Sequence, residues 1–351
     1  MRVATRILHP LVAAWSATWR AGEPVEQAEF GFEMFGSGQY QGSPGQTIME
    51  RNAPLRIRLD GPRLDSEHDL FRELRSIGLI DYYGLPLRSV AGTFGYCAFA
   101  TSSPEGFVDV DLPGFDDVVD LVCPFVEALN MRKITAVLLD TYVGQWAGAR
   151  VLGGQIRRGD CDLIRAAFWY SDLRDFTGLN ERLTADEVVD LLNCYFDVVD
   201  CSIRPRGGEV LQFIGDAILG VFESDGSADG DRTACQNAVD AAVDALAEME
   251  RLNLSRKADE RSPIRFGVGL HLGSATCGNV GAEKRLSFNV VGSSINLAAR
   301  LEALSKETPY ALIASSTMER AVPGCLISIG SFRLKGVEAP QPAFTARAPT
   351  N

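Results

Sequence analysis

The chain has 351 residues, of which 46% are hydrophobic and 23% charged, as expected for a soluble globular protein long enough for two domains. Its formal net charge of −12 argues against a nucleic-acid partner or an anionic membrane surface, because binding such polyanions needs a basic stripe. No run of about 18 apolar residues occurs, so we expect no membrane span. The eight cysteines form no C-x-x-C pair, which favours reduced thiols and a cytoplasmic location.

Residues 1–130 predict a small α+β domain. A Gly-, Ser- and Gln-rich segment at 36–46 predicts a loop, 56–59 predict a strand, and 67–77 have the apolar spacing of a helix. Residues 81–129 then predict a strand, a turn, a second strand, a short loop and a helix. This order is similar to the second half of a GAF-type sensor domain, which implies a regulatory module.

The ligand of this first domain is unknown from its sequence. His9 and His68 are candidate haem or metal ligands, but no second ligand follows either at a metal-binding spacing. Isolated histidines are more often surface residues or residues with satisfied hydrogen bonds. The alternative is a domain that packs or dimerises without any ligand.

Residues 131–162 predict a helical connector interrupted by glycines. Apolar residues recur along 134–151, and the face that they form needs a partner. A second copy of the chain would supply one. The polar segment at 154–162 then leads into the next domain.

Two patterns in residues 163–351 bring two carboxylates to one place. Residues 164–170 predict a buried strand, with Asp172 just past its end. Residues 210–213 and 217–222 predict a hairpin with a glycine turn, and Asp216 lies at its tip. Two carboxylates without a nearby Cys or His suit a hard cation such as Mg²⁺. The competing interpretation is that both are ordinary turn residues.

The remaining pattern predicts a mixed sheet flanked by helices, an α+β fold. Thr184 and Glu187 form a capping box before a long one-sided helix, and an Ala-rich helix follows at 231–252. A strand at 264–270 precedes a loop punctuated by glycines. Alternating strands and helices with hairpins favour this fold class.

A third pattern adds an amide and a guanidinium. Asn296 and Arg300 lie four residues apart on a predicted helix, so they share a face. Neither has an obvious carboxylate partner in that turn. Such a pair is suited to holding a sugar and a phosphate.

Five ordered blocks resemble the catalytic domain of class III adenylate and guanylate cyclases, over roughly residues 163–345. They are SDLRDFT at 171–177, GGEVLQFIGDAILGVF at 207–222, GVGLHLGSATCGNVG at 267–281, FNVVGSSINLAAR at 288–300 and RLKGV at 333–337. The resemblance implies conversion of ATP to 3′,5′-cyclic AMP and pyrophosphate, in active sites shared across a homodimer.

The resemblance also assigns roles to the acid pair and to the amide and guanidinium. Asp172 and Asp216, with the Leu173 carbonyl, would hold two Mg²⁺ ions per site, and Mn²⁺ can substitute. Asn296 would orient the ribose. Arg300 would stabilise the α-phosphate.

The substrate-binding residues follow from the same resemblance. Lys335 and the backbone N–H groups of Phe176 and Thr177 would bind the terminal phosphates, although a lone Lys before Gly is otherwise a solvated edge residue. Gln212 and Asn289 occupy the base-reading positions.

Three positions depart from the family pattern. Gln212 and Asn289 are amides, which can present a donor or an acceptor to either purine, so ATP is expected and GTP is the alternative substrate. Asp175 stands where a Gly is usual, and it would repel a triphosphate unless Arg174 or a metal pairs with it.

The rival functions differ in kind. A pseudo-cyclase would bind nucleotide without turnover, but both acids, the amide and the guanidinium are present. A diguanylate cyclase would need an acidic-aromatic pair where this hairpin has Val210 and Leu211. The segment GAEKR lacks the spacing of a P-loop.

Overall fold

The structure is a computed structural model that describes residues 1–61, 68–90 and 92–347. The chain divides into two compact units, Met1–Thr141 and Tyr142–Asn351. Glu67, the first residue of the helix predicted at 67–77, lies outside the described residues. Among the described residues, no helix has the length and apolar character needed to cross a membrane.

The N-terminal unit is built on a six-stranded antiparallel sheet with the strand order β3-β2-β1-β6-β5-β4. The strands are β1 Arg2–Arg6, β2 Ala14–Thr18, β3 Glu26–Phe30, β4 Leu55–Arg58, β5 Asp81–Ser89 and β6 Gly92–Thr101. Its helical segments are η1 Phe32–Gly36, α1 Pro44–Arg51, α2 Asp69–Ser76, η2 Asp109–Asp111 and α3 Leu112–Val143.

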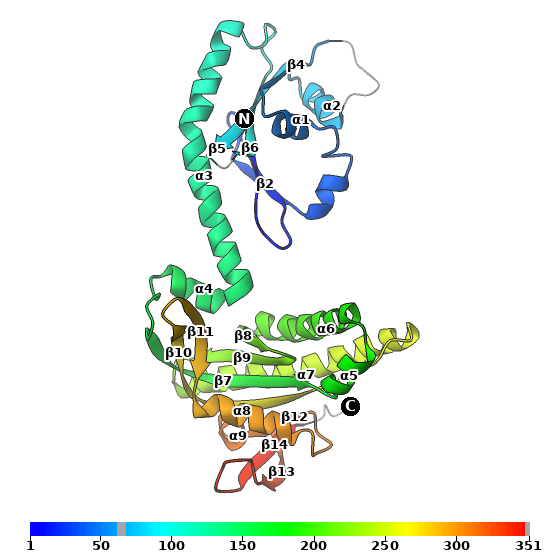
Figure 1. The fold of residues 1–351 in the computed structure, drawn as a ribbon, viewed down its shortest axis with the longest axis vertical. Helices are drawn as coiled ribbons and strands as arrows, with labels where there is room; N and C mark the ends of the chain where they lie inside the picture. The colour runs from blue at the N-terminus through cyan, green and yellow to red at the C-terminus, as the bar shows by residue number, and fades with distance from the viewer. Residues whose placement is uncertain (62–67, 91, 348–351) are drawn as a thin grey trace. The chain divides into compact units, whose positions relative to one another are not determined.

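Both faces of this sheet are covered (Figure 1). Val3 and Leu85 belong to a buried cluster that packs against Val119 of α3. On the opposite face, Tyr82 packs with Ile48 of α1 and Phe71 of α2. The strands at β4, β5 and β6 were predicted, whereas β1 to β3 were not, because they are short and bury few residues.

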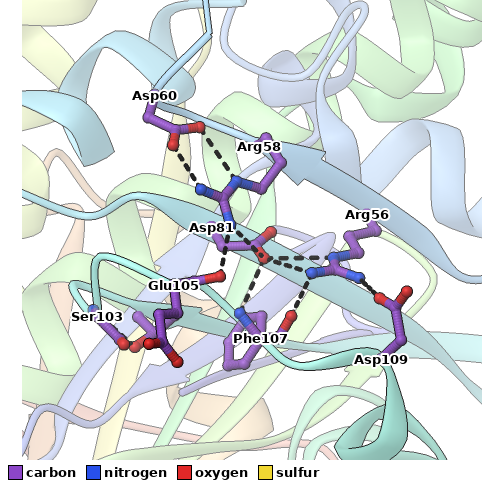
Figure 2. A network of polar contacts seen from close by, with 9 residues as sticks. Arg56, Arg58, Asp60, Asp81, Ser103, Glu105, Phe107 and Asp109 are labelled. Atoms are coloured by element: carbon purple, nitrogen blue, oxygen red, sulfur yellow. Dashed lines mark hydrogen bonds and ion pairs between the residues drawn. The ribbon is translucent and has the colours of Figure 1, made fainter.

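A polar network ties β4 and β5 to the segment that leads into α3 (Figure 2). Asp81 is fully buried, and its Oδ2 accepts hydrogen bonds from Arg56 Nη2 at 2.9 Å and from the Phe107 N–H at 3.0 Å. Arg56 also bonds to Asp109. Arg58 Nη1 donates to the Glu105 carbonyl at 2.8 Å. A guanidinium and a backbone amide thus bond to Oδ2 of this buried carboxyl, whereas its Oδ1 has no hydrogen-bond partner among the described residues.

The C-terminal unit contains an eight-stranded mixed sheet with the order β13-β14-β12-β10-β7-β9-β8, and β11 pairs with β10. The strands are β7 Cys161–Leu173, β8 Glu209–Ile214, β9 Ala217–Ser224, β10 Phe266–Ala282, β11 Arg285–Val291, β12 Leu312–Ser315, β13 Leu326–Phe332 and β14 Gln341–Ala346. Its helices are α4 Gln145–Leu152, α5 Phe176–Arg182, α6 Ala185–Ile203, η3 Arg204–Arg206, α7 Ala228–Ala258, α8 Ser293–Leu304 and α9 Ser316–Ala321. The sheet and its flanking helices confirm the predicted α+β class.

Alternation along β7 divides the core of this unit. Trp169 is buried with Tyr195 of α6 in the cluster that also includes α7, whereas Phe168 belongs to the cluster on the other face with Ala298 of α8. The predicted capping box of Thr184 and Glu187 begins α6. The central strand therefore has helices on both sides, as its nearly continuous apolar sequence indicated.

The prediction of a loop after residue 270 was wrong. Strand β10 continues to Ala282, and its glycines serve close approach instead of turns. A Cβ atom at Gly269 would collide with the Ala298 carbonyl, because α8 packs directly on the strand there. The predicted end of the strand before Asp172 is corrected in the same way, since β7 runs on to Leu173.

The predicted domain boundary at residue 130 falls inside α3. This helix runs without interruption from Leu112 to Val143, and Gly144, at φ +90°, separates it from α4. The segment before β7 thus contains the last turns of one helix and the whole of a second, shorter one.

Candidate active site

The two predicted acids meet at one end of the central strands. Asp172 is paired in register with Ala217 of β9 and Gly267 of β10. Asp216 immediately precedes Ala217, in a two-residue turn where Gly215 takes a φ of +65°. The hairpin therefore brings the Asp216 carboxyl within hydrogen-bonding reach of Asp172.

Without a cation, the negative charges of the two acids repel each other. The pKa of Asp216 is raised from 3.8 to about 6, first by burial and then by the negative charge of Asp172. Two carboxylates in contact resist simultaneous ionisation, and a cation between them removes the repulsion. Among the described residues, no group of three or more His, Cys, Asp or Glu side chains is arranged to hold a metal ion.

Lys306, which the sequence reasoning missed, contacts one acid of this pair, Asp172. Its Nζ lies 2.6 Å from Asp172 Oδ2 and 3.7 Å from Glu302 Oε2. Glu302 is almost fully buried, and burial is the main cause that raises its pKa to about 7. The spacing of Glu302 and Lys306, four residues apart at the end of a predicted helix, was the available signal.

Arg174, one of the two predicted partners of Asp175, does not pair with it. Arg174 lies beside Glu302, 3.4 Å from its Oε1, and it also bonds to Ser305. Asp175 pairs instead with Arg182, at 3.0 Å. Asp175 has a φ of +56°, in the left-handed region, which explains why glycine suits this position.

Asn296 and Arg300 lie on one face of α8, as predicted. Asn296 is exposed and Arg300 is half-buried. A Cβ atom at Gly336 would lie 3.2 Å from Arg300 Nη2, so the turn that carries Lys335 lies against this guanidinium. The structure thus brings the predicted phosphate-binding Lys335 close to Arg300.

Helix α8 and the residues just beyond it carry two functional groups on opposite sides. Successive residues of a helix turn by about 100°, so Glu302 points about 160° away from Arg300. Glu302 and Lys306 face Asp172, whereas Arg300 faces the turn at Gly336. Within one chain, the acid pair and the guanidinium therefore lie on different sides of this helix.

Comparison with known proteins finds a family match for most of the C-terminal unit. Residues 164–321 match the family model for the adenylate and guanylate cyclase catalytic domain. The chain is 35% identical over 162 residues to the terminal-differentiation-specific adenylate cyclase of Dictyostelium discoideum, and 29% identical over 149 residues to adenylate cyclase 1 of Rhizobium meliloti. The C-terminal unit therefore contains a class III nucleotidyl cyclase catalytic domain.

These matches cover only part of this chain and a smaller part of each relative. The matches cover 46% and 42% of this chain, and 7% and 22% of the two relatives. A solved bacterial light-regulated adenylyl cyclase has a TM-score of 0.54 at 25% identity, with 64% of each chain covered. The GAF-like resemblance of residues 1–130 stays a prediction.

Divalent metal ions serve catalysis in this cyclase family, and the residues present here fit such an ion. Asp172 and Asp216 offer hard oxygen ligands close to each other, and burial together with the negative charge of Asp172 raises the pKa of Asp216. Leu173 ends β7 directly after Asp172, so its backbone lies beside the pair. Lys306 supplies the positive charge nearest to Asp172 among the described residues.

The remaining predicted residues of the cyclase domain lie on separate elements. Gln212 is on the edge strand β8 and Asn289 is on β11, and both are partly exposed. The Asn289 side-chain oxygen accepts a hydrogen bond from the Val290 N–H at 3.0 Å. Phe176 and Thr177 begin α5, so their N–H groups have no partner within that helix.

Proposed function

We propose that the chain converts ATP to 3′,5′-cyclic AMP and pyrophosphate. The ribose 3′-oxygen attacks the α-phosphorus, the bond to the pyrophosphate oxygen breaks, and the hydroxyl proton is released. The observation that carries the proposal is the coexistence of a contacting acid pair with Asn296 and Arg300 in a cyclase catalytic domain. The two curated relatives described above are both adenylate cyclases, which supports ATP as the substrate.

The amide and the guanidinium act on the reacting nucleotide. Asn296 holds the ribose so that its 3′-oxygen faces the α-phosphorus, and Arg300 offsets the charge that builds on the α-phosphate as the bond breaks. Loss of one such contact typically costs about 100-fold in rate. Lys335, on the turn beside Arg300, reaches toward the terminal phosphates.

Asp172 and Asp216, with the Leu173 carbonyl, would hold two Mg²⁺ ions, for which Mn²⁺ can substitute. When bound, the ions lower the pKa of the ribose hydroxyl and offset the charge of the phosphates. Because Lys306 bonds to Asp172, its ammonium group must move or share that carboxylate when an ion binds.

A symmetric homodimer completes each site. The acid pair of one chain works with Asn296 and Arg300 of a second, because the two groups face opposite sides of α8 within one chain. Phe213 and Ile214, at the tip of the hairpin that carries Asp216, are 52% and 43% exposed and suit burial against a partner.

Helix α3 offers a second surface to a copy of the chain. Val118, Val122, Phe125 and Leu129 are exposed and follow each other at spacings of four, three and four residues. This spacing is typical of the seam of a coiled coil, which places two identical helices side by side. The dimer would then be held at both units.

GTP is the alternative substrate. Gln212 and Asn289 are amides, and each can turn to present a donor or an acceptor, so the base-reading positions fit adenine and guanine. Because the base-reading positions fit both bases, we expect measurable use of GTP. Because the two relatives described above are adenylate cyclases, we expect ATP to be used faster.

The decisive experiment mixes two inactive variants of the purified chain. Asp172→Asn removes a metal ligand and Arg300→Met removes the guanidinium, so each alone should form almost no cyclic nucleotide from ATP with Mg²⁺ or Mn²⁺. In an equal mixture, half of the dimers contain one intact site out of two, so activity should return to about a quarter of the wild-type value.

The control for this mixture is Asp190→Asn, at an exposed position on α6, which should remain fully active. A mixture that stays inactive, although chains are shown to exchange, would place all groups of the site in one chain. Absence of product from either nucleoside triphosphate in the wild type would favour the pseudo-cyclase.

A further inference from the structure

The N-terminal unit contains a cavity of about 380 Å³ on the sheet face that α1 and α2 cover. Ala4 of β1 and Tyr96 of β6 form its floor, and residues of η1, α1 and α2 form its cover. This volume lies within the range of small-molecule sites, which starts at about 300 Å³. A wider hollow of about 1060 Å³ adjoins it, and Arg2, Leu70, Glu73 and Tyr96 line both, so Arg2 lies between the two.

Aromatic side chains line one part of the cavity. Phe35 and Tyr40 meet edge to face with ring centroids 4.9 Å apart. The Arg6 guanidinium lies 5.6 Å from the centre of the Phe35 ring, and its Nη2 donates to the Tyr40 hydroxyl at 3.1 Å. Phe30 and Tyr96 add two further rings. Such a lining suits a flat, largely apolar ligand.

Two arginines from one face of β1 give the cavity positive charge. Arg2 and Arg6 both line it, and neither forms an ion pair with a carboxylate among the described residues. Two acids also belong to the lining, but Asp69 is largely exposed and pairs with Arg72, and Glu73 is exposed at the rim. The guanidiniums are thus available to an anionic ligand.

Two buried N–H donors in the cavity wall have no acceptor among the described residues. One is Arg2 Nε, although Arg2 Nη2 donates to Ser16 Oγ at 3.3 Å. The other is His68 Nε2: because His68 Nδ1 accepts a hydrogen bond from the Leu70 N–H at 3.1 Å, the ring proton belongs on Nε2. Buried donors without acceptors are costly and rare, and they call for an acceptor that binds there.

We propose that this cavity binds a small aromatic carboxylate. The ring of the ligand lies among the aromatic side chains, and its carboxylate accepts hydrogen bonds from Arg2, supported by His68. A planar carboxylate matches the planar guanidinium, and the unpaired charge of Arg2 and Arg6 excludes a cationic ligand. The inference concerns the N-terminal unit and is independent of the proposed cyclase reaction.

Isothermal titration calorimetry on the full chain tests the proposal, with benzoate, 1-naphthoate and indole-3-carboxylate as probes. Each acid is compared with its neutral carboxamide, which has the same ring. We expect at least one acid to bind and to raise the melting temperature, and its carboxamide to bind about tenfold more weakly or less.

Three variants locate the site. Arg2→Met should weaken binding of the acid at least about tenfold and leave binding of the carboxamide unchanged. Ala4→Leu, which fills the cavity floor, should abolish binding of both while the circular dichroism spectrum stays that of the wild type. Arg132→Met, at an exposed position on α3, is the matched control and should bind as the wild type does.

The proposal is overturned by any of three results. The first is no binding of the three acids at millimolar concentration. The second is equal binding of an acid and its carboxamide. The third is binding that survives Ala4→Leu in a folded protein, which would place the ligand elsewhere.

Discussion

Aspartate side chains have opposite surroundings in the two units, as Asp81 of the N-terminal unit and the pair of Asp172 and Asp216 in the C-terminal unit show. Asp81 is fully buried and is supplied with a guanidinium at 2.9 Å and an amide N–H at 3.0 Å. Burial, and then the charge of the neighbouring Asp172, raise the pKa of Asp216. A buried carboxylate that accepts hydrogen bonds from nearby donors stabilises the fold. Two neighbouring carboxylates repel each other when both are ionised, and a bound cation offsets that repulsion.

The largest effect on stability is expected from Asp81→Ala. This change removes the buried partner of Arg56, which among the described residues keeps only Asp109 and the Phe107 carbonyl, and it leaves the Phe107 amide without an acceptor, so the N-terminal unit should lose about 3 kcal/mol of unfolding free energy. Urea denaturation followed by circular dichroism measures the loss. Asp60→Ala, which removes an exposed partner of Arg58, is the control and should change little. A loss in Asp81→Ala no greater than in the control would mean that the network does not stabilise the unit.

Removing a charge from the acid pair should raise stability, in contrast to the loss expected at Asp81. Because the folded-state pKa of Asp216 is raised from 3.8 to about 6, its contribution to stability is present below the unfolded value and is lost as pH rises through the folded value. The metal-free cyclase domain should therefore become less stable between these two values. Asp216→Asn should flatten that dependence and gain about 1 kcal/mol at pH 7.5, a figure reduced for the partial exposure of the group.

Thermal melts across this pH range, in a chelator, measure the effect. Excess Mg²⁺ at pH 7.5 should raise the melting temperature of the wild type but not that of Asp216→Asn, since only the intact pair binds the ion. Wild-type stability that rises from pH 4 to pH 6 faster than that of the variant would contradict the assigned shift.

Particular residues show how far the sequence could predict this molecule. The acids, the capped helix at Thr184 and the shared face of Asn296 and Arg300 were predictable, because each depends on local spacing or on a strand and its turn. Lys306 was not, since its contact with Asp172 arises from the packing of α8 across the sheet. The glycines of β10 led to the wrong prediction of a loop for a related reason. Gly269 is needed because α8, which is distant in sequence, packs closely against the strand there.

Lys306→Met removes the cation that partly compensates the negative charge of the acid pair. Without the ammonium group 2.6 Å from Asp172, the metal-free domain should melt at a lower temperature, because the carboxylates repel without compensation. The same loss should lower the Mg²⁺ concentration for half-maximal activity about threefold, since the ion no longer competes with a lysine. Lys257→Met, exposed at the end of α7, is the control. An unchanged Mg²⁺ requirement would show that Lys306 leaves Asp172 before the ion binds.

The smallest effect is expected at Asp175, an acid of the same unit with neither a buried cation nor an acidic partner. Its pair with Arg182 is exposed, so little stability is lost in Asp175→Gly, and the left-handed backbone at φ +56° becomes unstrained. Removing a negative charge next to the N–H groups of Phe176 and Thr177 should lower the KM for ATP roughly threefold and leave kcat unchanged. Steady-state kinetics separate the two constants, and Asp175→Asn, which keeps the side-chain volume, tests the charge alone. If Asp175→Gly lowers KM and Asp175→Asn does not, backbone strain and not charge limits nucleotide binding at this turn.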